Sequence, residues 1–449
     1  MPSTPALLAG LLYSRATDRD GGIEWNYSPG ILGHWVGTED HVWAAKITTK
    51  LGDVLRIYEF DRFNATMFQV DMLLYNGTLW AHPKTFNPNP TPLDGYWWTC
   101  VGQKFTSPTQ NCKPSPGNPG SRIIAPATDN WNTGVNGGPR VGPWPNYNAH
   151  CCNDAGKSYD PLSFGMGLVT ADMSYMHNQL TSADIFFDIP SELRPYVAIV
   201  DRDLFGPLNG LFHGHSLNGT KFWEGGIGHG SQRWYNWKDA PASPNHKHDA
   251  AENTTASLGG GCGDCGCFTE LQTGVAKTQF QIFHIPESST RQWTEFWKTM
   301  EAVPNGNNTL YDSDYNAVLK TVDEWVESSN GVPASQYHEM DKFFEEVAQR
   351  EVTAADVLHE GSSWGFVHQE LTGTRLSPSM YFGLAARDQD EATPWLELAR
   401  DGTFKTSLSS TIPLSFQTTD GQSASQRAHF VFPPSADCRS PTSPLCMST

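Results

Sequence analysis

Short segments in which apolar and polar residues alternate dominate the first two thirds of the chain. Three clear runs are Val42-Trp-Ala-Ala-Lys-Ile-Thr-Thr, Val54-Leu-Arg-Ile-Tyr-Glu-Phe and Met67-Phe-Gln-Val-Asp-Met-Leu-Leu-Tyr. Each is bounded by Gly, Asn or Asp, and a period of two between turn residues is typical of antiparallel strands. Similar runs occupy about 165–200 and 211–224, and a last one is Gln279-Phe-Gln-Ile-Phe-His-Ile. The pattern predicts a large antiparallel β domain over residues 20–290.

The spacing changes after residue 290. Helical spacing is present in Thr290-Arg-Gln-Trp-Thr-Glu-Phe-Trp, from Tyr315 to Ser328 and from Tyr337 to Val357, which predicts two or three helices. Residues 375–449 are mixed and rich in loop formers. We therefore expect a mainly β protein whose residues 291–449 form a smaller helical and loop-rich C-terminal region packed on the β domain.

Residues 105–165 interrupt the strand pattern. This segment is rich in Pro, Gly and Asn and shows little periodicity, yet it carries Trp131, Trp144 and Tyr147. Aromatic residues in a long excursion favour a loop that helps to form a site over a simple linker.

Charge and composition narrow the function classes. The chain of 449 residues has a formal net charge of −18, which argues against nucleic acid and anionic membranes as partners and suits a neutral ligand or a cation. No apolar run approaches the length of a membrane span. The 16 Trp and 23 Phe supply large rings for a core, although hydrophobic residues are only 38% of the chain. Composition gives no prediction of the oligomeric state.

Cysteines and glycosylation sequons favour an extracellular location. The chain has nine cysteines, and Asn-x-Ser/Thr sequons stand at Asn26, Asn64, Asn76, Asn218, Asn253 and Asn307. The close spacing of Cys100 with Cys112, and of Cys438 with Cys446, predicts two local disulfides. Two of Cys262, Cys265 and Cys267 are expected to be bridged, with Cys151 and Cys152 as partners for the rest. No secretory signal is evident, so we interpret the sequence as a mature chain or a fragment with an added Met1.

A metal site is the alternative use of the cysteine cluster. Cys262, Cys265 and Cys267, together with His246 and His248, offer five soft ligands in a short stretch, which is reminiscent of zinc. Cys-x-x-Cys is also a disulfide spacing, and the sequons favour an oxidising compartment. We predict no metal and no cofactor.

Glu270 is the most informative single residue. It stands in Cys267-Phe-Thr-Glu-Leu-Gln-Thr-Gly, a strand-like run that is otherwise apolar or uncharged. A carboxylate in a strand must point into water, toward a partner or into a polar site, because burying it alone is costly. Glu270 is therefore either an outward-facing strand residue or a general base directed into a cleft.

Several segments together resemble the galactose-mutarotase-like (aldose-1-epimerase-like) domain of a widespread family. Gly266-Cys-Phe-Thr-Glu-Leu-Gln-Thr-Gly is similar to the epimerase strand that carries the catalytic base. Further similar segments are Trp80-Ala-His-Pro-Lys-Thr-Phe-Asn-Pro-Asn, Met173-Ser-Tyr-Met-His-Asn, Gly210-Leu-Phe-His-Gly-His, Lys221-Phe-Trp-Glu-Gly-Gly and Pro394-Trp-Leu-Glu-Leu-Ala-Arg-Asp-Gly. The resemblance spans about 20–415 and implies an antiparallel β-supersandwich with a sugar-sized groove on a concave face.

One departure from the family pattern bears on activity. The family's mutarotases carry a His just before an aromatic pair in a strand where this chain has Gly95-Tyr-Trp-Trp-Thr. The usual acid of that position is therefore missing or replaced.

The resemblance and the chemistry of an anomeric carbon together select candidate residues. Glu270 is the candidate base or nucleophile, and the candidate proton donors are His213, His177 and Glu224. At most one of His213 and His215 is expected to face the groove with Glu270. Side chains that could pack against or hydrogen-bond a sugar are Trp97, Trp98, Trp223, Arg233, Trp234, Gln272 and His215.

These observations lead to two hypotheses. The first is a secreted carbohydrate-active enzyme, a glycoside hydrolase or an epimerase-like isomerase, that uses acid and base chemistry at an anomeric centre. The second is a non-catalytic glycan-binding or extracellular structural protein, which the absent His before Tyr96 favours. Both predict a carbohydrate as the partner.

Overall fold

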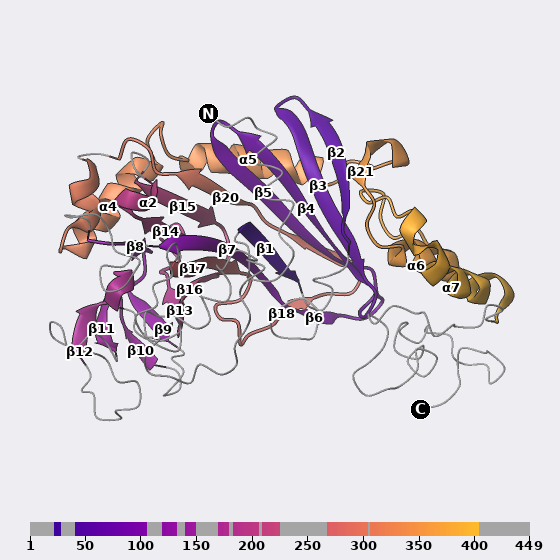
Figure 1. The fold of residues 1–449 in the computed structure, drawn as a ribbon, viewed down its shortest axis with the longest axis horizontal. Coiled ribbons are helices and arrows are strands. Elements are labelled where there is room, and N and C mark those ends of the chain that lie inside the picture. The colour runs from indigo at the N-terminus through magenta and orange to yellow at the C-terminus, as the bar shows by residue number, and fades with distance from the viewer. Residues whose placement is uncertain are drawn as a thin grey trace, which may run out of the picture.

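Two large antiparallel sheets pack against each other and define the fold. The computed structural model describes residues 22–27, 41–105, 119–132, 140–149, 169–178, 183–205, 209–224, 267–303 and 306–403. A 7-stranded sheet has the order β1-β7-β17-β16-β13-β9-β10, and a 10-stranded sheet has the order β21-β2-β3-β4-β5-β20-β15-β14-β8 with β19 paired to β5 (Figure 1). The protein is thus mainly β, an antiparallel supersandwich, as the sequence predicted.

The strands have the following bounds. The 7-stranded sheet consists of β1 (Gly22–Tyr27), β7 (Trp97–Phe105), β17 (Cys267–Gly274), β16 (Gly219–Glu224), β13 (Ala183–Asp188), β9 (Asp129–Asn132) and β10 (Arg140–Pro143). The 10-stranded sheet consists of β21 (Val357–His359), β2 (Trp43–Thr49), β3 (Gly52–Asp61), β4 (Thr66–Tyr75), β5 (Thr78–Asn87), β20 (Glu295–Thr299), β15 (Gly210–His215), β14 (Tyr196–Val200), β8 (Arg122–Ile124) and β19 (Ser289–Gln292). Two small pairs are β11 (Asn146–Ala149) with β12 (Val169–Asp172), and β18 (Phe283–Ile285) with β6 (Leu93–Gly95).

The helices are few and mostly C-terminal. They are α2 (Arg202–Phe205), α4 (Tyr315–Val326), α5 (Ala334–Val347), α6 (Trp364–Thr372) and α7 (Gln389–Asp401), with the short 3-10 turns η1 (Met176–Asn178), η4 (Gly306–Tyr311), η5 (Ala354–Asp356) and η6 (Ala386–Asp388). Within the described residues, no helix is both long and apolar enough to cross a membrane.

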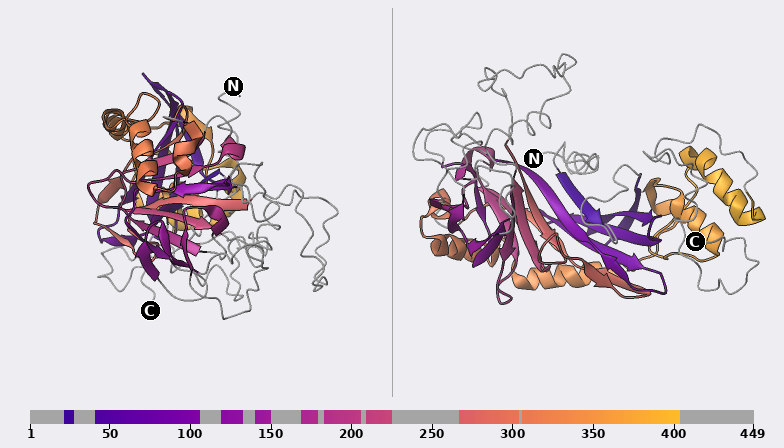
Figure 2. Two further views of the ribbon diagram at one scale, coloured as in Figure 1. Left: turned by 90° about the vertical axis from the view of Figure 1, so that its left-hand side faces the viewer. Right: turned by 90° about the horizontal axis from the view of Figure 1, so that it is seen from below.

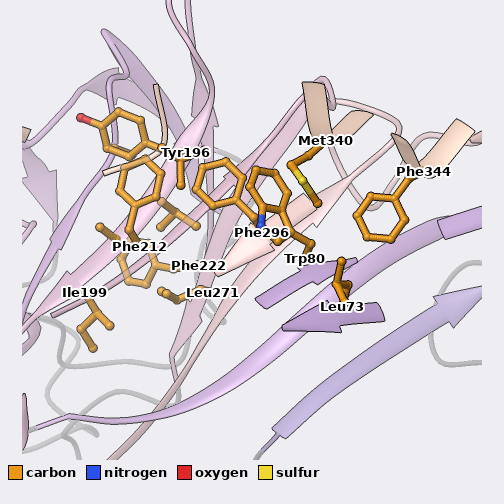
Figure 3. Packing of buried hydrophobic residues seen from close by; sticks show 14 of the residues in the cluster. Leu73, Trp80, Tyr196, Ile199, Phe212, Phe222, Leu271, Phe296, Met340 and Phe344 are labelled. Atoms are coloured by element: carbon orange, nitrogen blue, oxygen red, sulfur yellow. The ribbon is translucent and has the colours of Figure 1, made fainter. Parts of the chain in front are cut away.

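Side-chain alternation gives each sheet one face toward the other. On the 10-stranded sheet, Ile57 and Val70 point inward and pack in one cluster with Trp97 of the 7-stranded sheet. A second cluster joins Leu271 and Phe222 to the rings of both sheets, as Figure 3 shows. Core side chains therefore lie between the two sheets and also between the 10-stranded sheet and the C-terminal helices, and the opposite face of the 7-stranded sheet carries other side chains.

Helices α4 and α5 pack on the outer face of the 10-stranded sheet, whereas α6 and α7 lie beyond its end near β21 (Figure 1). Helix α5 runs along this sheet (Figure 2), where Phe344 stacks on His82 of β5 with ring centroids 5.6 Å apart and planes at 4°. Trp325 of α4 contacts Phe212 of β15 at 5.5 Å between centroids. These two helices thus lie on the side of the 10-stranded sheet that faces away from β17.

Three segment predictions change in the structure. The helix expected at Thr290-Arg-Gln-Trp-Thr-Glu-Phe-Trp is wrong, because these residues form β19 and β20 and pair with β5. The long loop expected at 105–165 contains four short strands, β8 to β11. The helix expected at Tyr315–Ser328 is confirmed as α4, whereas the one expected at Tyr337–Val357 begins at Ala334 and ends at Val347.

Cys100 is not in a disulfide, and Cys112, its predicted partner, lies outside the described residues. Cys100 is a buried thiol in the middle of β7, and Asn26 Nδ2 donates to its sulfur at 3.5 Å. Closeness in sequence does not bring two Cα atoms within disulfide reach, and a mid-strand position constrains the thiol further. The other predicted bridges fall on cysteines outside the described residues, apart from Cys267 at the start of β17.

We expect stability to fall with acidification through the buried imidazole of His82. Burial lowers the pKa of His82 from its ordinary 6.5 to about 4. Between pH 6.5 and pH 4 the unfolded chain binds a proton that the folded chain does not bind. The contribution of the neutral imidazole to the unfolding free energy is therefore complete above pH 6.5 and is lost as the pH falls toward 4. A pKa difference of this size between the folded and unfolded chain corresponds to about 3 kcal/mol of unfolding free energy. Urea unfolding at a series of pH values measures it.

A matched pair of variants isolates His82. His82 Nδ1 lies 2.8 Å from Thr294 Oγ1, and an asparagine amide can occupy that nitrogen's place. His82→Asn should flatten the decline in unfolding free energy between pH 6.5 and 4, whereas the same change at the exposed His338 of α5 should not. An unchanged slope in His82→Asn would contradict the assignment. His215 contributes in the same direction, because burial lowers its pKa well below 6.5.

Candidate functional site

Glu270 lies on the face of the 7-stranded sheet that points away from the 10-stranded sheet. Its neighbours Leu271 and Thr273 point inward, where Leu271 joins the core and Thr273 donates to Glu295 of β20 at 3.3 Å. Because successive side chains of a strand alternate, Glu270 and Gln272 share the opposite face. We call this side of the sheet the Glu270 face. The carboxylate is 7% exposed there.

A continuous set of polar contacts connects Glu270 to the ion pair of the buried Lys221 with the partly exposed Asp184. Gln272 Nε2 donates to Glu270 Oε2 at 2.5 Å, and Gln279 Nε2 donates to Gln272 Oε1 at 3.0 Å. Lys221 Nζ donates to Gln279 Oε1 and lies 2.6 Å from Asp184 Oδ1. We call these five side chains the Asp184–Glu270 network. The hydrogen bond from Gln272 orients the carboxylate of Glu270.

A small aromatic cluster supports this network. Tyr96, Trp98 and Phe186 are buried together on the Glu270 face, and Lys221 Nζ lies 5.8 Å from the Trp98 ring and 5.2 Å from the Phe186 ring. The Trp98 ring lies over Gly274, where an added Cβ would come within 2.3 Å of Trp98 Cε2. The glycine thus makes room for the indole, and the rings hold the lysine beside its carboxylate partner.

The strand register aligns these side chains in rows across the sheet. Residues directly opposite each other on paired strands share a face. One row consists, from edge to edge, of Glu24, Cys100, Gln272, Lys221, Phe186, Trp131 and Val141. The adjacent row contains Gly102, Glu270, Trp223 and Asp184. The Glu270 face therefore carries acidic, amide, cationic and aromatic groups in register.

Four of the predicted site residues meet on this face. Gln272 contacts Glu270 directly, and Trp223 is directly opposite Glu270 in the register. Trp98 lies on the same face but is fully buried, so its ring packs on Lys221 rather than offering a surface to a ligand.

The proton donors expected from β15 lie elsewhere. His213 Nε2 is 3.2 Å from Glu295 Oε2 between the two sheets, where Glu295 also accepts from Thr99 and from Trp293. The rings of His213 and His215 are 5.9 Å apart on one side of β15, because residues two positions apart share a face. Neither faces Glu270, so both assignments to its groove are wrong.

Trp97 is the other correction. The side chain is 1% exposed and packs in the core against Trp293, with ring centroids 5.0 Å apart. Its Nε1 donates to Thr99 Oγ1 at 3.0 Å. Trp97 and Trp98 are successive residues of β7 and point to opposite faces, so only Trp98 reaches the Glu270 face.

The remaining predicted residues lie wholly or partly outside the described residues. Arg233, Trp234 and the histidines of the zinc alternative are outside them, and for His177 and Glu224 only the backbone is described, in η1 and at the end of β16. Within the described part of the chain, no group of three or more His, Cys, Asp or Glu side chains is arranged to hold a metal.

Sequence reasoning missed Lys221, Asp184 and Gln279. The period of two on β16 places Lys221 on the same face as Trp223, which was a usable signal. Asp184 and Gln279 gave none, because their proximity to Gln272 depends on the β13–β16–β17 register and on the turn after β17.

Comparison with known proteins gives matches at the level of structure alone. No protein-family model and no curated protein matches the sequence. A TPR-domain-containing protein from Parabacteroides distasonis is 12% identical over 62% of this chain and 37% of that chain, with a TM-score of 0.42. A candidate aldose 1-epimerase from Klebsiella pneumoniae is 8% identical over 70% of each chain, with a TM-score of 0.38. A galactose-mutarotase-related enzyme from Lactobacillus acidophilus is 6% identical over 58% of this chain and 72% of that chain, with a TM-score of 0.31. Galactose-mutarotase-like structures are thus among those that this chain is similar to.

Proposed function

We propose that the protein binds a carbohydrate on the Glu270 face and that Glu270 acts as a proton acceptor at the anomeric centre. The observation that carries the proposal is the hydrogen bond of 2.5 Å from Gln272 to Glu270 at one end of the Asp184–Glu270 network. This bond orients the carboxylate. A base must be held in reach of the hydroxyl proton that it accepts.

The sequence resemblance supports the same assignment. Glu270 and Gln272 occupy the strand that is similar to the base-bearing strand of aldose 1-epimerases. The side chains around them suit a neutral polyhydroxylated ligand, because Gln272, Lys221 and Asp184 provide donors and acceptors beside the partly buried Trp223 ring. His213 is held by Glu295 in the interior, and Lys221 is the cation that contacts the Asp184–Glu270 network on this face.

The experiment is a screen for sugar turnover and sugar binding. Free aldoses are tested by NMR for faster exchange between their anomers, and a panel of glycans is tested for hydrolysis and binding. Accelerated anomer exchange or glycoside cleavage supports the catalytic proposal. A protein that neither turns over nor binds any sugar of the panel would refute it.

A non-catalytic glycan-binding function is the second candidate. The observation in its favour is that His213, the candidate donor on β15, and the sugar-binding candidate His215 face the interior instead of Glu270. Under this function Glu270 and Gln272 would hydrogen-bond sugar hydroxyls without transferring a proton. Glycan binding without turnover, retained in Glu270→Asp, would select this alternative.

Secretion is part of the proposal, and the sequons test it. Asn76 and Asn218 are exposed in connections between strands, whereas Asn26 is buried in β1 and donates to Cys100. Expression through a eukaryotic secretory pathway should give glycans at Asn76 and Asn218 and none at Asn26, as peptide mass spectrometry after deglycosylation would show. A secreted product with no glycan at either exposed sequon, or modification at Asn26, would contradict this.

A further inference from the structure

Two exposed aromatic side chains flank the buried Phe186 on the Glu270 face. Trp131 of β9 is directly opposite Phe186 in the register and is 47% exposed. Phe280 follows Gln279 of the Asp184–Glu270 network, is 64% exposed, and places its ring centroid 6.1 Å from that of Phe186. Large rings exposed next to a candidate ligand site indicate a binding surface.

These rings lie beyond the reach of a ligand that occupies Glu270 alone. From β17 to β9 the sheet order passes through β16 and β13, which makes three strand spacings, or about 14 Å. A single sugar ring bound at Glu270 therefore leaves Trp131 uncovered, whereas an extended ligand lying across the strands contacts both. Gln272, Lys221 and Phe186, which are buried, stand between Glu270 and the exposed Trp131 in the strand register.

Two carboxylates near Trp131 and Phe280 narrow the chemical class of the ligand. Asp184 and Asp188 flank Phe186 on β13 and share its face, and their side chains are 28% and 44% exposed. Each carboxylate is paired with a lysine, Asp184 with Lys221 at 2.6 Å and Asp188 with Lys277 at 3.0 Å, and an apolar protein surface docked here would remove both ion pairs from water. A sugar has C–H groups for the ring faces and hydroxyls that donate to the carboxylates. The net charge of −18 opposes an acidic partner or a second copy of the chain.

We propose that Trp131 and Phe280 form a second sugar subsite on the Glu270 face, so that the ligand is a neutral oligosaccharide rather than a free monosaccharide. The inference rests on the proposed function, because the first subsite is the one at Glu270. It assigns Trp131 and Phe280 to binding and leaves proton transfer to Glu270.

The test compares sugars of increasing length. Isothermal titration with glucose and galactose, and with malto-, cello- and β-1,4-galacto-oligosaccharides of two to six units, is run on the wild type and on Trp131→Ala/Phe280→Ala. One oligosaccharide series should bind more tightly than its monosaccharide, and the double variant should weaken the longest member roughly tenfold or more while leaving the monosaccharide unchanged. Phe63→Ala is the matched control, since Phe63 is 51% exposed on the turn between β3 and β4.

Three results overturn the inference while sparing the proposed function. The first is monosaccharide binding or turnover with no gain in affinity along any series. The second is a gain with length that survives in Trp131→Ala/Phe280→Ala. A double variant that changes sedimentation but not oligosaccharide affinity also overturns it, because the rings would then serve self-association. Failure of every sugar, at every length, refutes the proposed function and with it this subsite.

Discussion

Glu270→Gln is expected to lower turnover of an accepted sugar by about 10² to 10⁴-fold while leaving the protein folded. The amide has the shape of the carboxylate but cannot accept the proton, and removal of a positioned general base costs rates of this size. Stability should change little, because Gln272 Nε2 can still donate to the oxygen of a glutamine at position 270. Initial rates, measured with a sugar identified by the screen, give the ratio.

The control for Glu270→Gln removes one carboxylate elsewhere. Glu287→Gln makes the same change of charge at an exposed residue outside the site, and it should keep the wild-type rate. Turnover in Glu270→Gln equal to that of Glu287→Gln would remove Glu270 from the mechanism. If Glu270→Gln still binds the sugar but does not turn it over, the Glu270 face is needed for binding and the carboxylate for proton transfer.

The sequence predicted the strand at Glu270 because its chemistry and its period agree. Phe268-Thr-Glu-Leu-Gln-Thr-Gly is a short run that ends at a glycine, and a period of two places Gln272 beside Glu270 on one face. The helix at Tyr315–Val326 was equally accessible, since Val318, Val322, Trp325 and Val326 have helical spacing and are all buried. Local pattern and tertiary environment agree in both segments.

The helix predicted at 290–297 was wrong for a physical reason. Trp293, Phe296 and Trp297 are spaced as on a helix, yet they alternate between the two faces of a paired strand region. Short apolar runs fit both periods, and here pairing with β5 decides. The buried Glu295 within it is stabilised by Thr99, Trp293 and His213, and two of these partners lie far away in sequence.

The rest of the candidate site depends on register, which the sequence does not contain. Lys221 opposes Gln272 only because β16 and β17 pair with one particular alignment, and a shift by one residue would turn Lys221 to the core. The same holds for Trp131 opposite Phe186. Sequence reasoning therefore found the candidate base and its neighbour, but not the ion pair or the exposed rings that complete the face.

Arg56→Met is expected to destabilise the protein by about 3–5 kcal/mol, the cost of breaking a buried ion pair from one side. Arg56 is fully buried on β3, and its Nε and Nη2 donate to the two oxygens of Asp71 at 2.6 and 2.7 Å. Its Nη2 also donates to the carbonyl oxygen of Val347, and Nη1 donates to those of Arg350 and Ser379. Methionine fills similar space but leaves Asp71 charged in the interior and three carbonyl oxygens without their donor.

Denaturant unfolding of three variants tests this account. Total stabilities of folded proteins are about 5–15 kcal/mol, so Arg56→Met should shift the midpoint strongly or prevent folding. Arg56→Met/Asp71→Leu should recover part of the loss, because it removes the stranded charge together with its partner. Arg350→Met is the control, since Arg350 is exposed and its side chain donates to Thr48. Equal unfolding free energies for Arg56→Met and Arg350→Met would show that Arg56 does not join the C-terminal segments to the sheet. A double variant less stable than Arg56→Met would show that the stranded carboxylate of Asp71 is not the source of the loss.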